Sequence, residues 1–270
     1  MVEEKKAILL TGVSGGIGLE TAKKFLSGGY HVIGLDIKEP KEAIEGLTFI
    51  KTDLTKEKEI LIAFETISSS NFKLSSIICT AGIYDLNSLI EISEKEFIKT
   101  FDINVFATYR VNKIFLPLLK KGGKIIIISS ELAPLDPLPF TGIYAMSKSL
   151  LENYAYSLRM ELQLFGYKVV VIRPGAIDTG LIDISQQKLE DFVKNTTHYQ
   201  TNSKRFKEIV NSVENRKIHP SKIASLIYKV NEKKSPKYVY TINRNGGLLI
   251  LNSLPKKMQN SIIKGVLTKK

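Results

Sequence analysis

A glycine-rich turn, Thr11-Gly12-Val13-Ser14-Gly15-Gly16-Ile17-Gly18, follows an apolar run at Ala7–Thr11 and opens a helical pattern at Gly16–Ser27. Glycines allow a sharp turn and a close approach of the backbone to a pyrophosphate, and the start of a helix supplies amide donors. The turn therefore predicts a dinucleotide phosphate site made by Gly12, Ser14, Gly15, Gly16, Ile17 and Gly18. Such a turn alone is a weak signal, so the rest of the chain must supply its context.

Short apolar, β-branched runs alternate with helical patterns along most of the chain. Two of them, Ile125–Ile128 and Val169–Ile172, are apolar on both faces, as central strands of a parallel sheet are. The alternation predicts an α/β fold with a doubly wound parallel sheet. The expected strands are Ala7–Thr11, Tyr30–Asp36, Leu47–Thr52, Ser76–Thr80, Gly123–Ser129, Lys168–Arg173 and Tyr238–Ile242, and the expected helices are Gly16–Ser27, Glu57–Ser68, Ser93–Phe101 continuing to Lys120, Gly142–Phe165 and Ser221–Val230.

The domain organisation follows from composition. We predict one domain over residues 1–242, because no linker or repeat interrupts it. Residues 181–215 are polar and weakly patterned, which predicts a mobile lid over about 180–215 rather than a core element. Residues 243–270 form a basic amphipathic extension, in which Leu254, Met258, Ile262 and Val266 step by four.

Composition excludes several classes of protein. In 270 residues, 43% are hydrophobic and 24% charged, as in a globular protein, and the single cysteine, Cys79, forbids an internal disulfide. The three histidines are far apart, so we expect no metal site. The net charge of +12 lies entirely in residues 216–270, which argues for one basic face and against a nucleic-acid-binding fold. The chain shows no signal-peptide pattern or spanning run, so we expect a cytoplasmic protein.

Asp36 ends the second expected strand, 18 residues after Gly18. A carboxylate at this spacing accepts hydrogen bonds from an adenosine ribose and repels a 2′-phosphate, which favours NAD over NADP. Lys38 can relieve part of that repulsion, so NADP stays as the less favoured cofactor. Asp53 follows the third strand and is either a contact to the adenine end of the same cofactor or the N-cap of the next helix.

A tyrosine and a lysine four residues apart, Tyr144 and Lys148, lie on one face of an expected helix. The same spacing occurs at Tyr109 and Lys113, so spacing alone does not choose between the pairs. Tyr144 follows a buried strand that ends in Ser129-Ser130, and ligands of parallel sheets bind at the carboxyl ends of the strands. Placement therefore favours Tyr144 and Lys148.

These motifs together resemble the classical short-chain dehydrogenase/reductase family over roughly residues 5–240. The motifs that occur in family order are the glycine-rich turn, Asp53-Leu54, Ala81-Gly82, Asn104 in Asn-Val-Phe-Ala-Thr, the Ser-Ser strand end, Tyr-x3-Lys, and Arg173-Pro174-Gly175 with Thr179. The tail, with Asn243-Arg244-Asn245-Gly246-Gly247, is similar to the retinol/hydroxysteroid-dehydrogenase-like branch. The resemblance implies a Rossmann fold, an NAD(P)-dependent oxidoreductase, and a homodimer or homotetramer.

The resemblance also implies residue roles. Tyr144 is expected to be the general acid/base, Lys148 to lower the pKa of its phenol, Ser130 to bind the carbonyl or alkoxide oxygen, and Asn104 to hold a water that links Lys148 to solvent. The cofactor is expected to contact Asp53, Leu54, Ala81, Gly82, Tyr144, Lys148, Pro174, Gly175, Ile177 and Thr179. The alternatives are a turn hydroxyl for Ser130 and a capping amide for Asn104.

Two departures from the family pattern stand out. Cys79-Thr80-Ala81-Gly82 replaces the usual Asn-Asn-Ala-Gly, so the bracing amide side chains are absent. The interval from Ser130 to Tyr144 is one residue longer than the commonest arrangement, which leaves Ser129 as an alternative to Ser130.

The expected substrate is an apolar alcohol or ketone (steroid-, retinoid- or acyl-like), because Leu132, Leu135, Leu138, Phe140, Leu181, Ile182 and Ile184 flank the site. The alternative is that these residues only pack the lid and do not form the substrate site. The basic tail helix either lies on an anionic membrane surface or closes the pocket or a subunit interface. Two different functions stay open: a non-catalytic dinucleotide-binding scaffold, and a nucleic-acid-binding protein that uses the tail.

Overall fold

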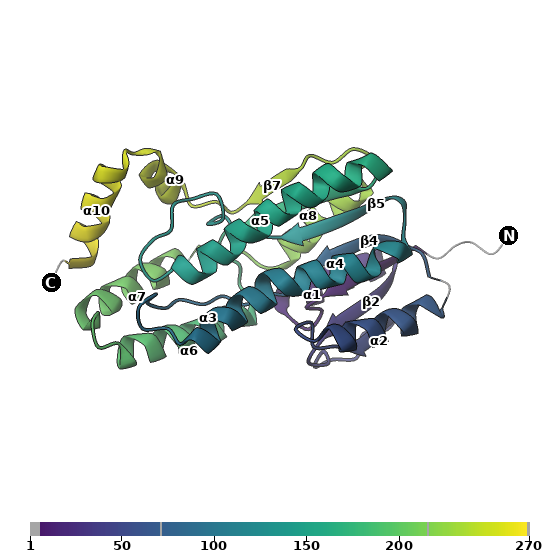
Figure 1. The fold of residues 1–270 in the computed structure, drawn as a ribbon, viewed down its shortest axis with the longest axis horizontal. Coiled ribbons are helices and arrows are strands. Elements are labelled where there is room, and N and C mark those ends of the chain that lie inside the picture. The colour runs from purple at the N-terminus through teal and green to yellow at the C-terminus, as the bar shows by residue number, and fades with distance from the viewer. Residues whose placement is uncertain (1–5, 71, 215, 269–270) are drawn as a thin grey trace.

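The computed structural model describes residues 6–70, 72–214 and 216–268 (Figure 1). Its strands are β1 (Ala7–Thr11), β2 (His31–Asp36), β3 (Leu47–Lys51), β4 (Leu74–Cys79), β5 (Leu119–Ile128), β6 (Lys168–Pro174) and β7 (Val239–Ile242). Its α-helices are α1 (Gly16–Ser27), α2 (Glu57–Ser68), α3 (Glu94–Phe101), α4 (Ala107–Phe115), α5 (Gly142–Leu162), α6 (Gly180–Asn195), α7 (Gln200–Glu214), α8 (Ser221–Glu232), α9 (Gly246–Ser253) and α10 (Lys256–Thr268). The expected α/β fold is confirmed.

The strands form one parallel sheet in the order β3-β2-β1-β4-β5-β6-β7. Starting from β1 in the middle of the sheet, β2 and β3 are added toward one edge, and β4 to β7 are then added toward the other edge. The strand order therefore reverses between β1 and β4, and ligands of open α/β sheets bind outside the carboxyl ends of the strands at such a point.

Two apolar layers hold helices to the faces of the sheet. Alternate residues of β1 supply both, because side chains of a strand point to opposite faces in turn. Ala7 and Leu9 pack toward α2, α4 and α5, whereas Ile8 and Leu10 pack toward α1 and α8. The apolar runs in β5 and β6 do the same, which explains why both of their faces are hydrophobic.

The expected long helix from Ser93 to Lys120 is interrupted. A π-helical turn, Asp102–Phe106, separates α3 from α4, and a 3-10 turn, Leu116–Leu118, carrying Pro117, leads into β5. The strand β5 accordingly begins at Leu119, four residues before the expected start. π-Helical turns inside α-helices are frequent at functional sites, and this one carries Asn104.

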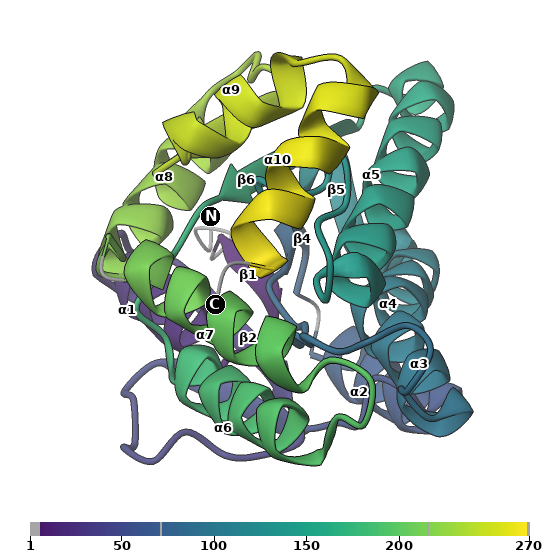
Figure 2. The same cartoon turned by 90° about the vertical axis from the view of Figure 1, so that its left-hand side faces the viewer.

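Four helices, α6, α7, α9 and α10, stand beyond the carboxyl ends of the strands, and we call them the cap (Figures 1 and 2). Residues 181–215 were expected to contain no core element, and this is wrong, because α6 and α7 contribute the buried Leu189, Phe192 and Phe206. That the segment is a mobile lid stays a prediction. A third apolar cluster joins the cap to two loops of the domain; it contains Leu86, Phe140, Leu189, Phe192, Phe206 and Leu267. The polar residues that suggested a loop occupy the exposed faces of these helices.

The tail forms the expected helix, α10, but its packed face differs from the prediction. Gln259 and Leu267 are buried, and α10 packs on α7. The predicted stripe points outward instead: Met258 is 51% exposed and Ile262 is 42% exposed. The proposal that this stripe closes the pocket is therefore wrong. Within the described residues, no helix has the length and hydrophobicity to cross a bilayer.

Candidate active site

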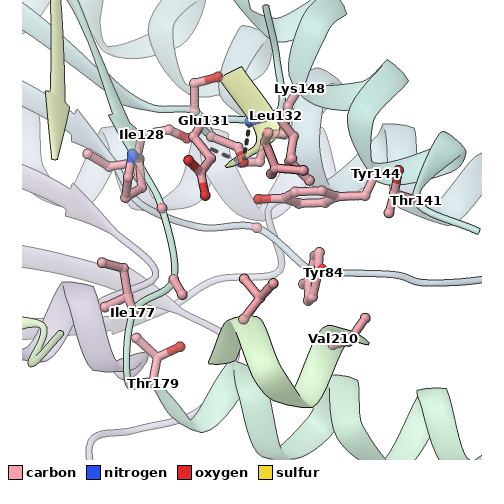
Figure 3. A pocket seen from close by; sticks show the side chains of 18 of the residues that line it. Tyr84, Ile128, Glu131, Leu132, Thr141, Tyr144, Lys148, Ile177, Thr179 and Val210 are labelled. Atoms are coloured by element: carbon pink, nitrogen blue, oxygen red, sulfur yellow. Dashed lines mark hydrogen bonds between the residues drawn. The ribbon is translucent and has the colours of Figure 1, made fainter. Parts of the chain in front are cut away.

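A pocket of about 230 Å³ lies at the carboxyl ends of β4, β5 and β6, beneath the cap (Figure 3). Its walls include Ser130, Tyr144 and Lys148 from the domain and Phe206 and Val210 from α7. The predicted residues that line it are Ile17, Gly82, Ser130, Tyr144, Lys148, Pro174, Gly175, Ile177 and Thr179.

The glycine-rich turn is packed so tightly that its glycines are required. Gly12 has a φ of 68°, and a Cβ there would lie 2.8 Å from the backbone of Ala81. A Cβ on Gly18 would lie 2.0 Å from the carbonyl oxygen of Gly12. The helix α1 therefore begins directly against the turn, and the backbone is left bare where a pyrophosphate would approach.

The carboxylate of Asp36 lies beside this turn. Its Oδ2 accepts a hydrogen bond from the Ser14 backbone N–H at 3.0 Å, and its Oδ1 accepts one from the Lys38 N–H at 3.2 Å. The Ser14 hydroxyl donates to the Lys38 carbonyl. The end of β2 and the turn are thus joined through one acidic side chain, while the Lys38 side chain is exposed.

Asp53 forms a turn of its own. Its Oδ1 accepts hydrogen bonds from the Thr55 N–H at 3.0 Å and the Thr55 hydroxyl at 2.7 Å. The N-cap of α2 is Lys56, so the predicted N-cap role for Asp53 is wrong. The neighbouring Leu54 is buried.

The end of β4 is braced by a hydroxyl in place of the usual amides. Thr80 donates a 2.6 Å hydrogen bond to the Thr11 carbonyl, and the Ala81 N–H donates to the Thr11 hydroxyl at 3.3 Å. Cys79 is buried in the core, where burial raises the pKa of its thiol to about 12. The thiol is therefore a packing group and no nucleophile.

The phenol of Tyr144 faces the pocket that Ser130 also lines (Figure 3). The Ser130 hydroxyl accepts a 3.2 Å hydrogen bond from the Leu132 N–H, as the alternative of a turn hydroxyl implies. Burial raises the pKa of the Tyr144 phenol to about 12; the nearby Ser130 hydroxyl acts to lower this pKa, and the charge of Glu131 acts to raise it. The expected lowering by Lys148 is therefore not seen in the protein alone, since desolvation of a phenolate dominates. Ser129 also lines the pocket, and its hydroxyl has no hydrogen-bond partner among the described residues, so the choice between Ser129 and Ser130 stays a prediction.

Lys148 is 5% exposed, and its Nζ lies 5.8 Å from the centroid of the Tyr144 ring. Burial lowers its pKa to about 8. Asn104 is held by three hydrogen bonds: its amide donates to the Ile83 carbonyl and to the Ser147 hydroxyl, and its Oδ1 accepts from the Ile83 N–H. Asn104 and Lys148 both approach Gly82, where a Cβ would lie 3.1 Å from the Asn104 Oδ1 and 3.4 Å from the Lys148 Nζ.

The segment after β6 closes the other side of the pocket. Thr179, just before α6, touches the glycine-rich turn, since a Cβ on Gly16 would lie 2.9 Å from its Cγ2. Gly175 is equally confined, because its Cβ would lie 1.9 Å from the Asn243 carbonyl oxygen. The structure therefore brings the turn, the Ser-Ser strand end, Tyr144, Lys148 and the β6 end to one edge of the sheet.

Of the predicted apolar walls, Leu132 and Leu138 line the pocket. Leu135 borders a smaller neighbouring hollow, and Phe140 packs in the third cluster. The side chains of Leu181, Ile182 and Ile184 lie outside the described residues. The competing pair, Tyr109 and Lys113, lies away from the pocket on α4, where Tyr109 is 43% exposed.

Sequence reasoning missed three parts of the pocket. Tyr84 packs edge to face on Tyr144, with ring centroids 4.6 Å apart. Glu131 brings a second acid-base group beside Ser130. One face of α7 covers the pocket with four apolar side chains, Phe206, Ile209, Val210 and Val213. These residues are spaced three or four apart, a helical pattern that could have been found in the sequence.

Comparison with known proteins agrees with this geometry. The family model described as short chain dehydrogenase matches residues 6–190. The chain is a short-chain dehydrogenase. As such it is an NAD(P)-dependent oxidoreductase, and its glycine-rich turn, Asp36 and pocket fit a dinucleotide: the backbone is bare at the turn, and a carboxylate lies beside it.

Two curated relatives of this short-chain dehydrogenase carry substrate names. A 3-ketodihydrosphingosine reductase of Bacteroides thetaiotaomicron is 29% identical over 237 residues, covering 87% of each chain. Estradiol 17-beta-dehydrogenase 2 of Mus musculus is 32% identical over 191 residues, covering 66% of this chain and 50% of the relative. A short chain dehydrogenase family protein from Francisella tularensis has a similar structure, with a TM-score of 0.75 at 26% identity over 91% of this chain and 99% of the other.

Proposed function

We propose that this short-chain dehydrogenase interconverts an apolar ketone and the corresponding secondary alcohol, with NAD(H) as the favoured cofactor. The observation that carries the proposal is that Ser130, Tyr144 and Lys148 line one pocket whose other walls are largely apolar. Asp36 favours NAD, since its carboxylate lies beside the phosphate turn and a 2′-phosphate would be repelled there.

The residues divide the chemistry as follows. When bound, the nicotinamide supplies a hydride to the carbonyl carbon, or accepts one from the alcohol. In reduction, Tyr144 donates its phenolic proton to the carbonyl oxygen, and Ser130 hydrogen-bonds the same oxygen as negative charge develops on it. The Lys148 ammonium then stabilises the resulting phenolate, and a proton from solvent restores the phenol. Asn104 holds the main chain at Ile83 beside Lys148.

The names of two relatives support a ketone or alcohol substrate with a large apolar part, a keto compound in the Bacteroides protein and estradiol in the mouse protein. The pocket walls contributed by Leu132, Leu138, Phe206 and Val210 suit such a molecule. A non-catalytic scaffold is the competing function, and the placement of Ser130, Tyr144 and a buried Lys148 in one pocket argues against it.

Turnover by Tyr144→Phe tests the function. We expect medium-chain ketones to oxidise NADH in the presence of the unaltered protein, and Tyr144→Phe to reduce kcat by at least about 100-fold with little change in NADH affinity. Tyr109→Phe is the matched control, because Tyr109 has the same spacing to a lysine outside the pocket. Full activity of Tyr144→Phe would contradict the proposed proton transfer.

We also propose a homodimer or homotetramer in which α4 and α5 pair with a second copy. Their outer faces expose several large apolar side chains that a partner would bury: Phe106 just before α4, Tyr109 on α4, and Leu150, Tyr156 and Met160 on α5. Exposed apolar patches of this kind mark interaction sites.

A second proposed surface is the outward stripe of α10. Met258, Ile262 and Val266 are exposed beside Lys257 and Lys264, and no acidic residue follows Glu232 in the chain. An apolar stripe flanked by lysines suits an anionic lipid surface. This helix packs on α7, which covers the pocket, so such a contact would bring an apolar substrate near its entrance.

A further inference from the structure

Glu131 is a carboxylate in an otherwise largely apolar pocket. It directly follows Ser130, is 8% exposed and lines the same cavity as Tyr144. Figure 3 shows its carboxylate pointing into the cavity on the side of the Tyr144 hydroxyl. A buried charge of this kind is costly unless a partner compensates it.

One of its two oxygens is already used. Oε2 accepts a 2.6 Å hydrogen bond from the Asn245 N–H, at the residue that caps α9, and this contact fixes the side chain. Oε1 accepts no hydrogen bond from a described residue. It lies in the space that Gly175 leaves open, since a Cβ on that glycine would be 3.0 Å away.

The charge of Glu131 is also incompletely balanced. The nearby cation is Arg244, an exposed residue that forms no ion pair with Glu131 within the described part of the chain. Lys148, the cation within the pocket, donates to the Ile128 carbonyl instead. The open oxygen of this buried carboxylate can therefore accept a hydrogen bond from a cationic donor on the ligand.

We propose that Glu131 determines specificity by binding a protonated amine that the substrate carries on a carbon next to the reacting carbonyl. Ser130, which binds the reacting oxygen in the proposed reaction, and Glu131 are consecutive residues that line the same pocket, so a donor that reaches Glu131 lies close to the reacting carbonyl. The preferred substrate is then an α-amino ketone, or its amino alcohol, with an apolar chain beneath α7. The inference rests on the proposed function and names its substrate class.

Two matched ketones and two variants test the inference. The probes are a medium-chain α-amino ketone and the same ketone without the amine, assayed with NADH at neutral pH. We expect the unaltered protein to prefer the amino ketone, and Glu131→Gln to reduce that preference in kcat/KM by about 10- to 100-fold. The glutamine keeps an acceptor for the Asn245 N–H, so the fold of α9 is retained. Asp136→Asn is the control, since Asp136 pairs with Lys256 outside this pocket.

Calorimetric binding of the two corresponding alcohols separates this inference from the proposed function. If neither ketone is turned over but the amino alcohol binds more tightly and loses that advantage in Glu131→Gln, the proposed reaction fails and the amine site stands. If both ketones react equally well with the unaltered protein, the amine site is wrong and the reaction stands. An equal loss for both substrates in Glu131→Gln would also overturn the inference, because it would indicate a general effect on the cofactor or the fold.

Discussion

The ammonium of Lys148 donates a 3.1 Å hydrogen bond to the carbonyl oxygen of Ile128, the last residue of β5. This contact ties α5 to the strand whose end carries Ser130. It helps to hold Tyr144 near Ser130, even though 13 residues, including a proline-containing loop, lie between them. The lysine thus positions the site as well as supplying charge.

The pH dependence of ketone reduction tests the charge of Lys148. Burial lowers its pKa to about 8, so the ammonium loses its proton as the pH rises through that value. The forming Tyr144 phenolate then loses its stabilising charge, and kcat/KM is expected to fall above about pH 8. In Lys148→Arg the guanidinium stays charged, so this fall is expected to vanish while activity at neutral pH decreases. An unchanged pH profile in the arginine variant would exclude Lys148 as its origin.

Cofactor preference depends on Asp36. We expect Asp36→Asn to weaken NADH binding and to strengthen NADPH binding, changing their affinity ratio by about 10- to 100-fold, because the repulsion of a 2′-phosphate is removed. The nicotinamide's own fluorescence reports both titrations, since the chain has no tryptophan. Tighter binding of NADPH than NADH by the unaltered protein would mean that Lys38 outweighs Asp36.

The proposed subunit interface is tested by charge. Leu150→Glu and Met160→Glu place carboxylates on the exposed face of α5 and are expected to convert an oligomer to a monomer in sedimentation velocity. Ile62→Glu on α2 is the control, since Ile62 is 62% exposed on another helix. A monomeric unaltered protein would rule out the interface.

The outward stripe of α10 is tested with liposomes. Met258→Ser with Ile262→Ser removes exposed apolar side chains without touching the buried Gln259 and Leu267. We expect the unaltered protein to sediment with anionic but not neutral vesicles, and the double variant to bind several-fold more weakly. Equal vesicle binding by both proteins would contradict a lipid contact through this stripe.

Because the cap has its own apolar cluster, we expect it to unfold independently of the sheet. Phe206 is 5% exposed and packs edge to face on Phe140, with centroids 5.2 Å apart. Phe206→Ala is expected to cost about 3–5 kcal/mol locally and to raise KM, because α7 covers the pocket. Hydrogen exchange should increase in α6, α7 and α10 while β1, β4 and β5 stay protected. Uniform loss of protection would show instead that cap and sheet unfold together.

The sheet and the dinucleotide turn could be predicted from the sequence because their signals are local. A β-branched run predicts a strand wherever it lies, and a glycine-rich turn before a helix keeps its meaning without tertiary contacts. The starts and ends of β1 and α2 were predicted to the residue, whereas β5 begins earlier because Leu119 pairs with Leu74 across a register shift.

The cap could not be predicted as easily because its stability comes from distant partners. Leu189 and Phe192 are isolated apolar residues in a polar segment, and they become a core only when Phe140 and Phe206 meet them. The packed face of α10 was predicted wrongly for the same reason. Leu267 belongs to that cluster, whereas Met258, Ile262 and Val266 of the more regular stripe are exposed. Likewise, the sequence placed Tyr144 near Lys148, but the effect of burial on the phenol pKa required the surrounding walls.

Asn245 links the far end of the chain to the site. Its side chain caps α9, and its N–H is the donor that holds Glu131 in the pocket. A displacement of α9 would therefore remove the hydrogen-bond donor that holds the Glu131 carboxylate. In the proposed amine site, such a displacement would change which ketone is preferred, so the C-terminal helices would act as a selectivity control.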